Sequence, residues 1–136
     1  MAWRDQNKFI PQSEIKEKVS EVAVKFAKDF GIYLGRGDNK LTTNQLRKFF
    51  GEVKRQQMQG YDKTDFILLK PKLAYAVGRA KNVRGQSPKI KDFYEVISNA
   101  IDLVQNESHF KNFIKIFEAI VAYHKAAEES KLNDNE

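Results

Sequence analysis

Eight side chains in the middle of the sequence have the types and spacing needed to bind phosphate. Seven are cations and the eighth is aromatic: Arg47, Lys48, Lys54, Arg55, Lys70, Lys72, Tyr75 and Arg79. Lysine and arginine attract the phosphates of nucleic acid, and an aromatic ring beside them can stack on an unpaired base. These residues therefore predict a nucleic-acid-binding surface.

The excess positive charge of the chain is confined to the same region. Residues 41–84 contain ten Lys or Arg and three Asp or Glu, a net charge of +7, whereas the whole chain has a net charge of +6. Everything outside this region therefore sums to −1, and residues 85–136 alone have a net charge of −3. A basic surplus confined to one third of a chain is typical of a surface that faces nucleic acid.

A helix that begins at Thr42 or Thr43 is predicted to carry four of the cations. Thr42 followed by Gln45 is a capping-box pattern, which satisfies the first free amides of a helix. Apolar residues then recur at the spacing of one helical face: Leu46, Phe49, Phe50 and Val53. Gly60 and the charged residues after it separate this helix from the next one.

The four cations fall on the exposed side of this predicted helix. At about 100° per residue, Arg47 and Lys54 lie nearly above one another. Lys48 and Arg55 do the same on the neighbouring row, and only Glu52 lies close enough on the helix to pair with them. Such rows could bridge neighbouring phosphates, and a solvated helix face would show the same pattern.

The second cationic segment surrounds Pro71, which fits the first turn of a helix, or a kink if the helix starts earlier. Lys70 and Lys72 flank this proline. The expected buried side of the helix consists of Leu73, Val77 and Ala80. Lys72, Tyr75 and Arg79 lie within about 60° of one another on a different side. Tyr75 between two cations is typical of a single-strand contact, and a core or partner contact is equally open.

The other long segments also have helical periodicity. One helix is predicted from Ser13 to Gly31, on apolar residues spaced three and four apart. Another begins at Ser87 and Pro88 and continues through Val104. After a break at residues 106–108 the pattern resumes and reaches His124.

Two short stretches carry weaker signals. Residues 31–39 are rich in glycine, but they lack the glycine spacing and the lysine of a phosphate-binding loop, so a plain connection between helices is expected. Residues 66–69 are four consecutive apolar residues, which could belong to the core or to an interface.

No segment alternates as a strand would, so the predicted fold class is all-α, a compact bundle of about five helices. The 136 residues are enough for one domain with its own core. Residues 1–12 are expected to form a polar arm and residues 131–136 a frayed tail. Trp3 in the arm is expected to pack or to be disordered rather than to contact a partner.

The composition gives little support to catalysis. The chain has no cysteine, which excludes disulfides, thiolate metal sites and cysteine nucleophiles. Its two histidines, His109 and His124, are fifteen residues apart on one predicted helix, about 22 Å, which is too far for a catalytic pair. His124 is expected to be a helix-end or half-buried residue. We therefore predict a non-enzymatic protein without metal or cofactor.

No stretch of the sequence has the apolar length of a signal peptide or of a membrane-spanning helix. With 41% hydrophobic and 31% charged residues, the composition is neither that of a disordered chain nor that of a membrane protein. The expected location is the cytoplasm, with no membrane partner.

Three strings of the sequence resemble the small helical subunit of type III-A CRISPR effector complexes, the Csm family. They are LTTNQLRKFF, LLKPKLAYAVGR and IVAYHK, in this order within residues 41–125, and LKPKLAYAVGR is the most distinctive. The resemblance implies a helical bundle without nuclease activity, stacked in several copies along the complex. Its implied partners are guide RNA and target RNA, the backbone and large subunits, and further copies of the same chain.

The resemblance also implies which residues face RNA. They are Arg47, Lys48, Lys54 and Arg55, then Lys70, Lys72 and Arg79, with Tyr75 from the same motif. The expected contact is electrostatic and independent of sequence, because base pairing reads the sequence in RNA-guided systems. Two alternatives stay open: a stand-alone nucleic-acid-binding regulator, and a structural module whose basic face meets an acidic protein. A ribonuclease is more remote.

Overall fold

The computed structural model describes residues 3, 8–37, 39–80 and 88–129. Seven helices and no strand occur in these residues: α1 (Gln12–Lys16), α2 (Glu21–Leu34), α3 (Thr43–Gln59), α4 (Lys63–Ile67), α5 (Leu69–Arg79), α6 (Ile90–Leu103) and α7 (Glu107–Glu128). Five of them are longer than two turns, and two are single short turns. The prediction of an all-α bundle of about five helices is confirmed.

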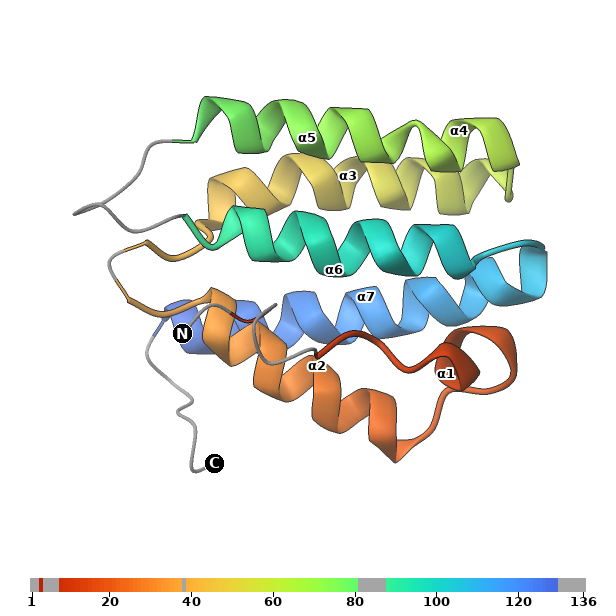
Figure 1. Cartoon of the computed structure of the whole chain (residues 1–136), viewed down its shortest axis with the longest axis horizontal. Helices are drawn as coiled ribbons and strands as arrows, with labels where there is room; N and C mark the ends of the chain where they lie inside the picture. The colour runs from red at the N-terminus through yellow and green to blue at the C-terminus, as the bar shows by residue number, and fades with distance from the viewer. Residues whose placement is uncertain (1–2, 4–7, 38, 81–87, 130–136) are drawn as a thin grey trace.

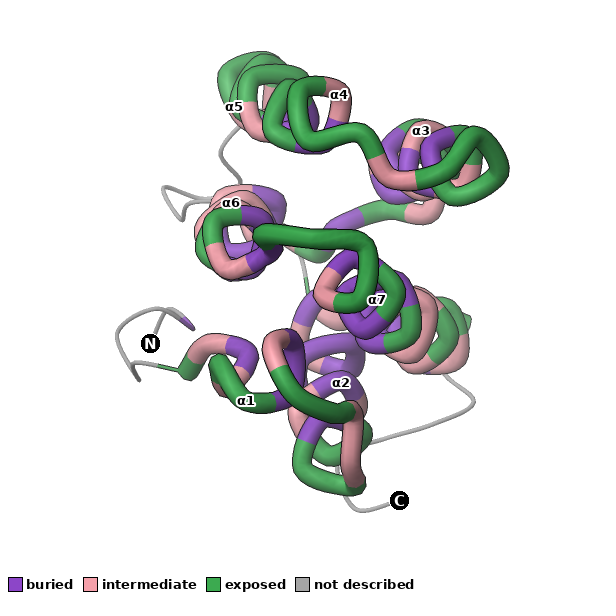
Figure 2. Tube along the Cα trace, turned by 90° about the vertical axis from the view of Figure 1, so that its right-hand side faces the viewer, coloured by how far each residue is buried: buried purple, intermediate pink, exposed green. Residues whose placement is uncertain are grey.

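The helices form two neighbouring stacks (Figures 1 and 2). In one stack α5 packs on α6, with the short α4 at its end, and in the other α3 packs on α7. At the opposite end of the molecule α2 packs extensively on α7, and α1 contacts both α6 and α7. Helices α3 and α5 therefore form the outer layer at one end of the bundle, as Figure 1 shows.

The core is one continuous hydrophobic cluster that runs the length of the bundle. Helix α7 supplies much of it, through Phe113 and Phe117, whose rings stack 5.9 Å apart. Phe49 from α3 meets Phe117 edge to face at 5.6 Å. Each fully buried phenylalanine contributes about 1.5–3 kcal/mol through the apolar surface it removes from water.

Trp3 belongs to this core. It is 5% exposed and lies among the rings of Phe26, Phe30 and Tyr33 of α2. Its indole nitrogen donates a 2.7 Å hydrogen bond to the carbonyl of Lys8, so the polar end of the ring is also satisfied. The expectation that Trp3 packs is confirmed. Residues 1–2 and 4–7 of the predicted arm, and the predicted frayed tail at residues 131–136, lie outside the described residues.

The predicted single helix from Ser13 to Gly31 is wrong, because the chain breaks between α1 and α2. The buried carboxylate of Glu14 makes this break. It accepts hydrogen bonds from the amide and hydroxyl of Ser20, both at 2.8 Å, and from the amide of Ala23 at 3.0 Å. Burial alone would raise the pKa of Glu14, but these hydrogen bonds outweigh it and lower the pKa. Helix α2 therefore starts at a cap built from two residues.

Gly31 does not end the helix either, because α2 continues to Leu34. Its role is close packing against α7. A Cβ atom placed on Gly31 would lie 2.8 Å from the carbonyl oxygen of Ile120 and 2.9 Å from the amide nitrogen of His124. Only glycine lets the two backbones approach this closely.

The predictions for the other helices agree better with the structure. Thr42 and Gln45 form the predicted capping box of α3, and Pro71 lies in the first turn of α5. The chain breaks before α7, whose N-cap is Asn106, and α6 begins at Ile90. Ser87, part of the predicted start of α6, lies outside the described residues.

Polar side chains on α7 fix the register of the elements around it. Asn112 donates a 2.8 Å hydrogen bond to the carbonyl of Ile15, and the Nε2 atom of His124 lies 2.5 Å from the carbonyl oxygen of Leu41. His124 lies near the end of α7, as one of the two expectations has it, but it is 1% exposed, so the expectation of a half-buried residue is wrong. The buried histidine contacts the carbonyl of Leu41, in the segment that leads into α3.

Candidate nucleic-acid interface

All eight predicted binding residues lie on α3 and α5, which run antiparallel in the outer layer (Figure 1). A groove of about 580 Å³ separates the two helices. Its floor is apolar and includes Phe49, Leu69 and Leu73. Four of the eight residues line it: Lys48, Lys72, Tyr75 and Arg79. The remaining four, which are Arg47, Lys54, Arg55 and Lys70, lie outside this lining.

Glu52 stands in the groove wall and links the two helices. One of its carboxylate oxygens lies 2.5 Å from the Nη2 atom of Arg55 and 3.0 Å from the Nζ atom of Lys72. The hydrogen bond from Arg55 is the main cause that lowers the pKa of Glu52 to about 2, with a further contribution from Lys72. Arg55 and Lys72 are therefore already engaged with an anion of the protein itself.

Lys54 and Lys70 are paired as well, with acids on other helices. The ammonium of Lys54 lies 2.6 Å from Glu118 on α7, and that of Lys70 lies 2.7 Å from Asp102 on α6. The prediction that only Glu52 could pair with the cations of α3 is therefore wrong. It failed because the helix wheel of α3 shows nothing of the helices packed beside it.

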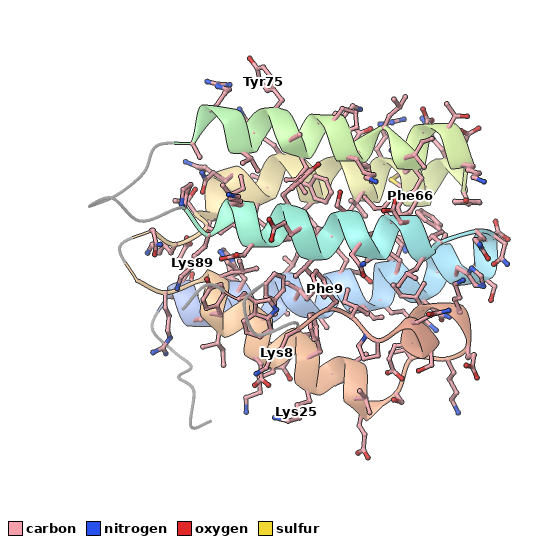
Figure 3. All side chains as sticks on the ribbon, in the orientation of Figure 1. Lys8, Phe9, Lys25, Phe66, Tyr75 and Lys89 are labelled. Atoms are coloured by element: carbon pink, nitrogen blue, oxygen red, sulfur yellow. The ribbon has the colours of Figure 1, made fainter. Side chains whose placement is uncertain are left out.

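Arg47 and Lys48 are exposed, and neither makes a hydrogen bond or an ion pair within the described part of the chain. Arg79 is exposed too, and its guanidinium lies 5.8 Å from the centre of the Tyr75 ring. The Tyr75 side chain projects away from the bundle (Figure 3), and the residue is 69% exposed, which excludes the core contact left open for it. These four residues form the part of the predicted surface that is open to a ligand.

The apolar run at residues 66–69 divides between two environments. Phe66 and Leu69 are buried in the core, where the Phe66 ring meets that of Phe113 at 5.1 Å. Ile67 and Leu68 are 45% and 46% exposed. The run therefore belongs partly to the core and leaves two large apolar side chains on the outside of α4 and α5.

The two histidines serve structural roles at separate places on α7. The Nδ1 atom of His109 accepts a 3.1 Å hydrogen bond from the amide of Gln105, next to the start of the helix. His124 lies in the core beside Leu41. No group of three or more histidine and acidic side chains that could hold a metal ion occurs in the residues that the structure describes.

None of the described helices combines the length and the apolar character needed to cross a bilayer.

Sequence reasoning missed the two acids that neutralise Lys54 and Lys70. The only signal for them was the net charge of −3 over residues 85–136, which shows that α6 and α7 carry acids but not which cations they meet. Sequence reasoning also missed the groove, because its width depends on how far α3 and α5 are held apart.

Fold and surface together define an all-helical protein whose outer helices present a groove rimmed by cations. Residues 16–130 match the family described as Csm2 type III-A, and the chain belongs to this family. It is therefore a small subunit of a type III-A CRISPR effector complex, and its partners include other subunits of that complex. The resemblance seen in the sequence is confirmed. No curated protein and no solved structure matches the chain significantly.

Proposed function

We propose that this subunit lines the channel in which guide RNA and target RNA pair, and that it binds RNA through the cations of α3 and α5. The observation that supports the proposal is that Arg47 and Lys48, beside the cationic rim of the groove, are both exposed and make no ion pair within the described residues. Exposed cations without internal partners bind phosphate without first breaking an ion pair. The contact is independent of sequence, because base pairing between guide and target supplies the specificity.

The proposal ranks the eight residues by their existing partners. Arg47, Lys48 and Arg79, with Tyr75 beside Arg79, form the primary RNA contact. Arg55 and Lys72 contribute less because Glu52 holds them both. Lys54 and Lys70 contribute least because each is paired with an acid of its own.

Repetition is part of the proposed mechanism. Several copies stacked along the complex would each add a few phosphate contacts, and copies held in one assembly act at high effective concentration. One copy alone is then expected to bind RNA weakly. The proposed role is non-catalytic, and the single hydrophobic cluster supports treating residues 1–136 as one domain.

The exposed apolar face of α4 and α5 supports the association of copies. Ile67 and Leu68 are large exposed apolar residues, and the exposed Ala74 and Gly78 further along α5 are small enough to let another helix approach closely. Replacing Ile67 and Leu68 with serine is expected to weaken self-association in sedimentation experiments without loss of helicity. Unchanged association would contradict this part of the proposal.

The experiment that tests RNA binding is fluorescence anisotropy with single-stranded RNA, an RNA duplex and a DNA duplex at low and moderate salt. The variant Arg47→Gln/Lys48→Gln is expected to bind RNA severalfold more weakly. For a single strand, the slope of the logarithmic salt dependence should fall by about 0.7 for each phosphate that the variant no longer neutralises. Lys54→Gln/Lys70→Gln, with the same change of charge, is expected to weaken binding less.

The matched control is Lys16→Gln/Lys18→Gln. These two lysines lie in and just after α1, away from α3 and α5, and make no ion pair within the described residues, and the double variant removes the same two charges. If all three double variants weaken RNA binding equally, the loss reflects the net charge of the protein alone, which would contradict the assignment of the binding surface to α3 and α5. Absence of RNA binding at low salt would favour the structural module, and preference for one DNA site would favour a regulator.

A further inference from the structure

The groove between α3 and α5 has the size and the chemistry of a site for one small ligand. Its volume of about 580 Å³ lies within the range of about 300–1,000 Å³ that small-molecule sites have. The floor is formed by apolar side chains, among them Phe49, Leu69 and Leu73. An apolar floor of this kind fits a flat, weakly polar group, and a phosphate alone would gain nothing from it.

The rim of the groove has the opposite character. Lys48, Lys72 and Arg79 stand on it, against a single acid, Glu52, whose charge is answered by Lys72 and by Arg55 outside the groove. The rim is therefore complementary to an anion. A ligand that fits the whole groove has a planar apolar part and a negatively charged part.

Tyr75 narrows the choice of ligand further. Its ring stands at the rim, 69% exposed, with the Arg79 guanidinium 5.8 Å from the ring centre. A large aromatic side chain left open to solvent beside a cation offers a stacking surface for a base whose phosphate the cation holds. Tyr75 lines the same groove as the apolar floor residues, so base and phosphate can be bound together.

We propose that the groove between α3 and α5 binds one unpaired nucleotide of an RNA strand, with the base against Tyr75 and the groove floor and the phosphate at Lys48 and Arg79. This inference rests on the proposed RNA-binding function and deepens it. A paired base is stacked inside a helix and cannot enter the groove. The groove therefore favours single-stranded or locally unpaired RNA over a continuous duplex, whereas Arg47 contacts the backbone of either form.

The first test is photocrosslinking of the full chain to an oligoribonucleotide with one 5-iodouridine, with the crosslinked residue mapped by mass spectrometry. The expected result is a crosslink at Tyr75 with the single strand, and none when the iodouridine is base-paired. A crosslink outside the groove, or one of equal yield in the duplex, would overturn the inference.

The second test compares affinities for single-stranded and duplex RNA of one sequence. Tyr75→Ala is expected to weaken single-strand binding about five- to hundredfold, the loss associated with one stacked base, and to leave duplex binding unchanged. Tyr75→Phe should retain the affinity because it keeps a ring. The control Met58→Ala, an 87% exposed apolar residue of α3 outside the groove lining, should change neither affinity.

The outcomes separate this inference from the proposed function. If Arg47→Gln/Lys48→Gln weakens RNA binding and Tyr75→Ala does not, the nucleotide site is wrong and the RNA-binding function stands. If no RNA binds at low salt, both are wrong. If Tyr75→Ala prevents assembly of the effector complex while single-strand binding is intact, the groove holds a side chain of a neighbouring subunit and the inference is overturned.

Discussion

The carboxylate of Glu52 on α3 lies 3.0 Å from the ammonium nitrogen of Lys72 on α5, twenty residues further along the chain. This ion pair crosses the groove that separates the two helices. Arg55 holds the same carboxylate from the α3 side. Glu52 therefore ties α3 to α5 across the groove.

Replacing Glu52 with glutamine is expected to lower the free energy of unfolding by about 1–2 kcal/mol near neutral pH. The folded-state pKa of about 2 lies below the ordinary value of 4.5, so the carboxylate stabilises the fold above pH 4.5. This contribution is lost as the pH falls from 4.5 towards 2. Urea unfolding of Glu52→Gln and of the wild type across this range measures the effect.

The control for this measurement is Glu17→Gln, an exposed glutamate that makes no ion pair within the described residues. Its unfolding free energy should stay close to that of the wild type at every pH. A stability difference between Glu52→Gln and the wild type that does not shrink on acidification would refute the role of the ion pair.

Two helical glycines are expected to respond to alanine with opposite signs. Gly31→Ala should lower the free energy of unfolding by about 2–3 kcal/mol, because the new Cβ would lie 2.7 Å from the Cβ atom of Tyr123. Gly51→Ala should raise it by about 0.5–1 kcal/mol, since alanine is the better helix former and no heavy atom outside the local backbone lies within 4 Å of its Cβ position. Chemical denaturation of both variants gives the comparison, and equal signs would contradict the close approach at Gly31.

His124→Ala is expected to cost about 2–4 kcal/mol of stability, because it opens a cavity and leaves the carbonyl of Leu41 without its donor. His109→Ala should cost about 1 kcal/mol or less, since it removes only a partly exposed contact at the start of α7. Thermal unfolding of the two variants distinguishes these roles. A His124→Ala variant as stable as His109→Ala would mean that the buried contact is wrongly placed.

The fluorescence of Trp3, the only tryptophan, is expected to report packing against α2. Native emission should be blue-shifted and poorly quenched by acrylamide, because the ring is 5% exposed. Phe26→Ala, which removes an edge contact at 5.9 Å, should shift the emission to the red. Phe50→Ala, a change of the same size against Phe117, should leave it unchanged. Equal shifts in the two variants would contradict the docking of Trp3.

The parts of the fold that could be predicted from the sequence are those whose signals are local. Thr42 and Gln45 stand three residues apart and cap the same turn, so their pattern marked the start of α3. The proline at position 71 and the polar break at Asn106 acted in the same way for α5 and α7. Each of these features is set by neighbours within one or two turns.

The first helix shows where periodicity fails. Ile15 and Phe26 keep helical spacing through the break between α1 and α2, so the apolar pattern contains no sign of it. The break is made by the carboxylate of Glu14, which reaches forward to Ser20 and Ala23. A cap of this kind depends on a loop conformation that a periodic pattern does not encode.

The candidate site shows a second kind of failure. All seven predicted cations lie on α3 and α5, but Lys54 pairs with an acid 64 residues away and Lys70 with one 32 residues away. Counting charges in the sequence gives the net charge of a segment, but not which of its cations are paired with acids after folding. The packing of α6 and α7 beside α3 and α5 determines which cations stay unpaired. The groove likewise depends on how these helices are arranged.

The central position of α7 has a consequence for how the protein is made. Helices α1, α2 and α3 all pack on α7, and Asn112 and His124 fix the segments around them. Yet α7 is the last of the described helices to be synthesised. At about 5–20 residues per second, a ribosome needs seconds to complete the chain after α2 has emerged. During that interval the apolar faces of α1, α2 and α3 cannot pack against α7. This subunit is therefore expected to finish folding only after residues 107–128 leave the ribosome.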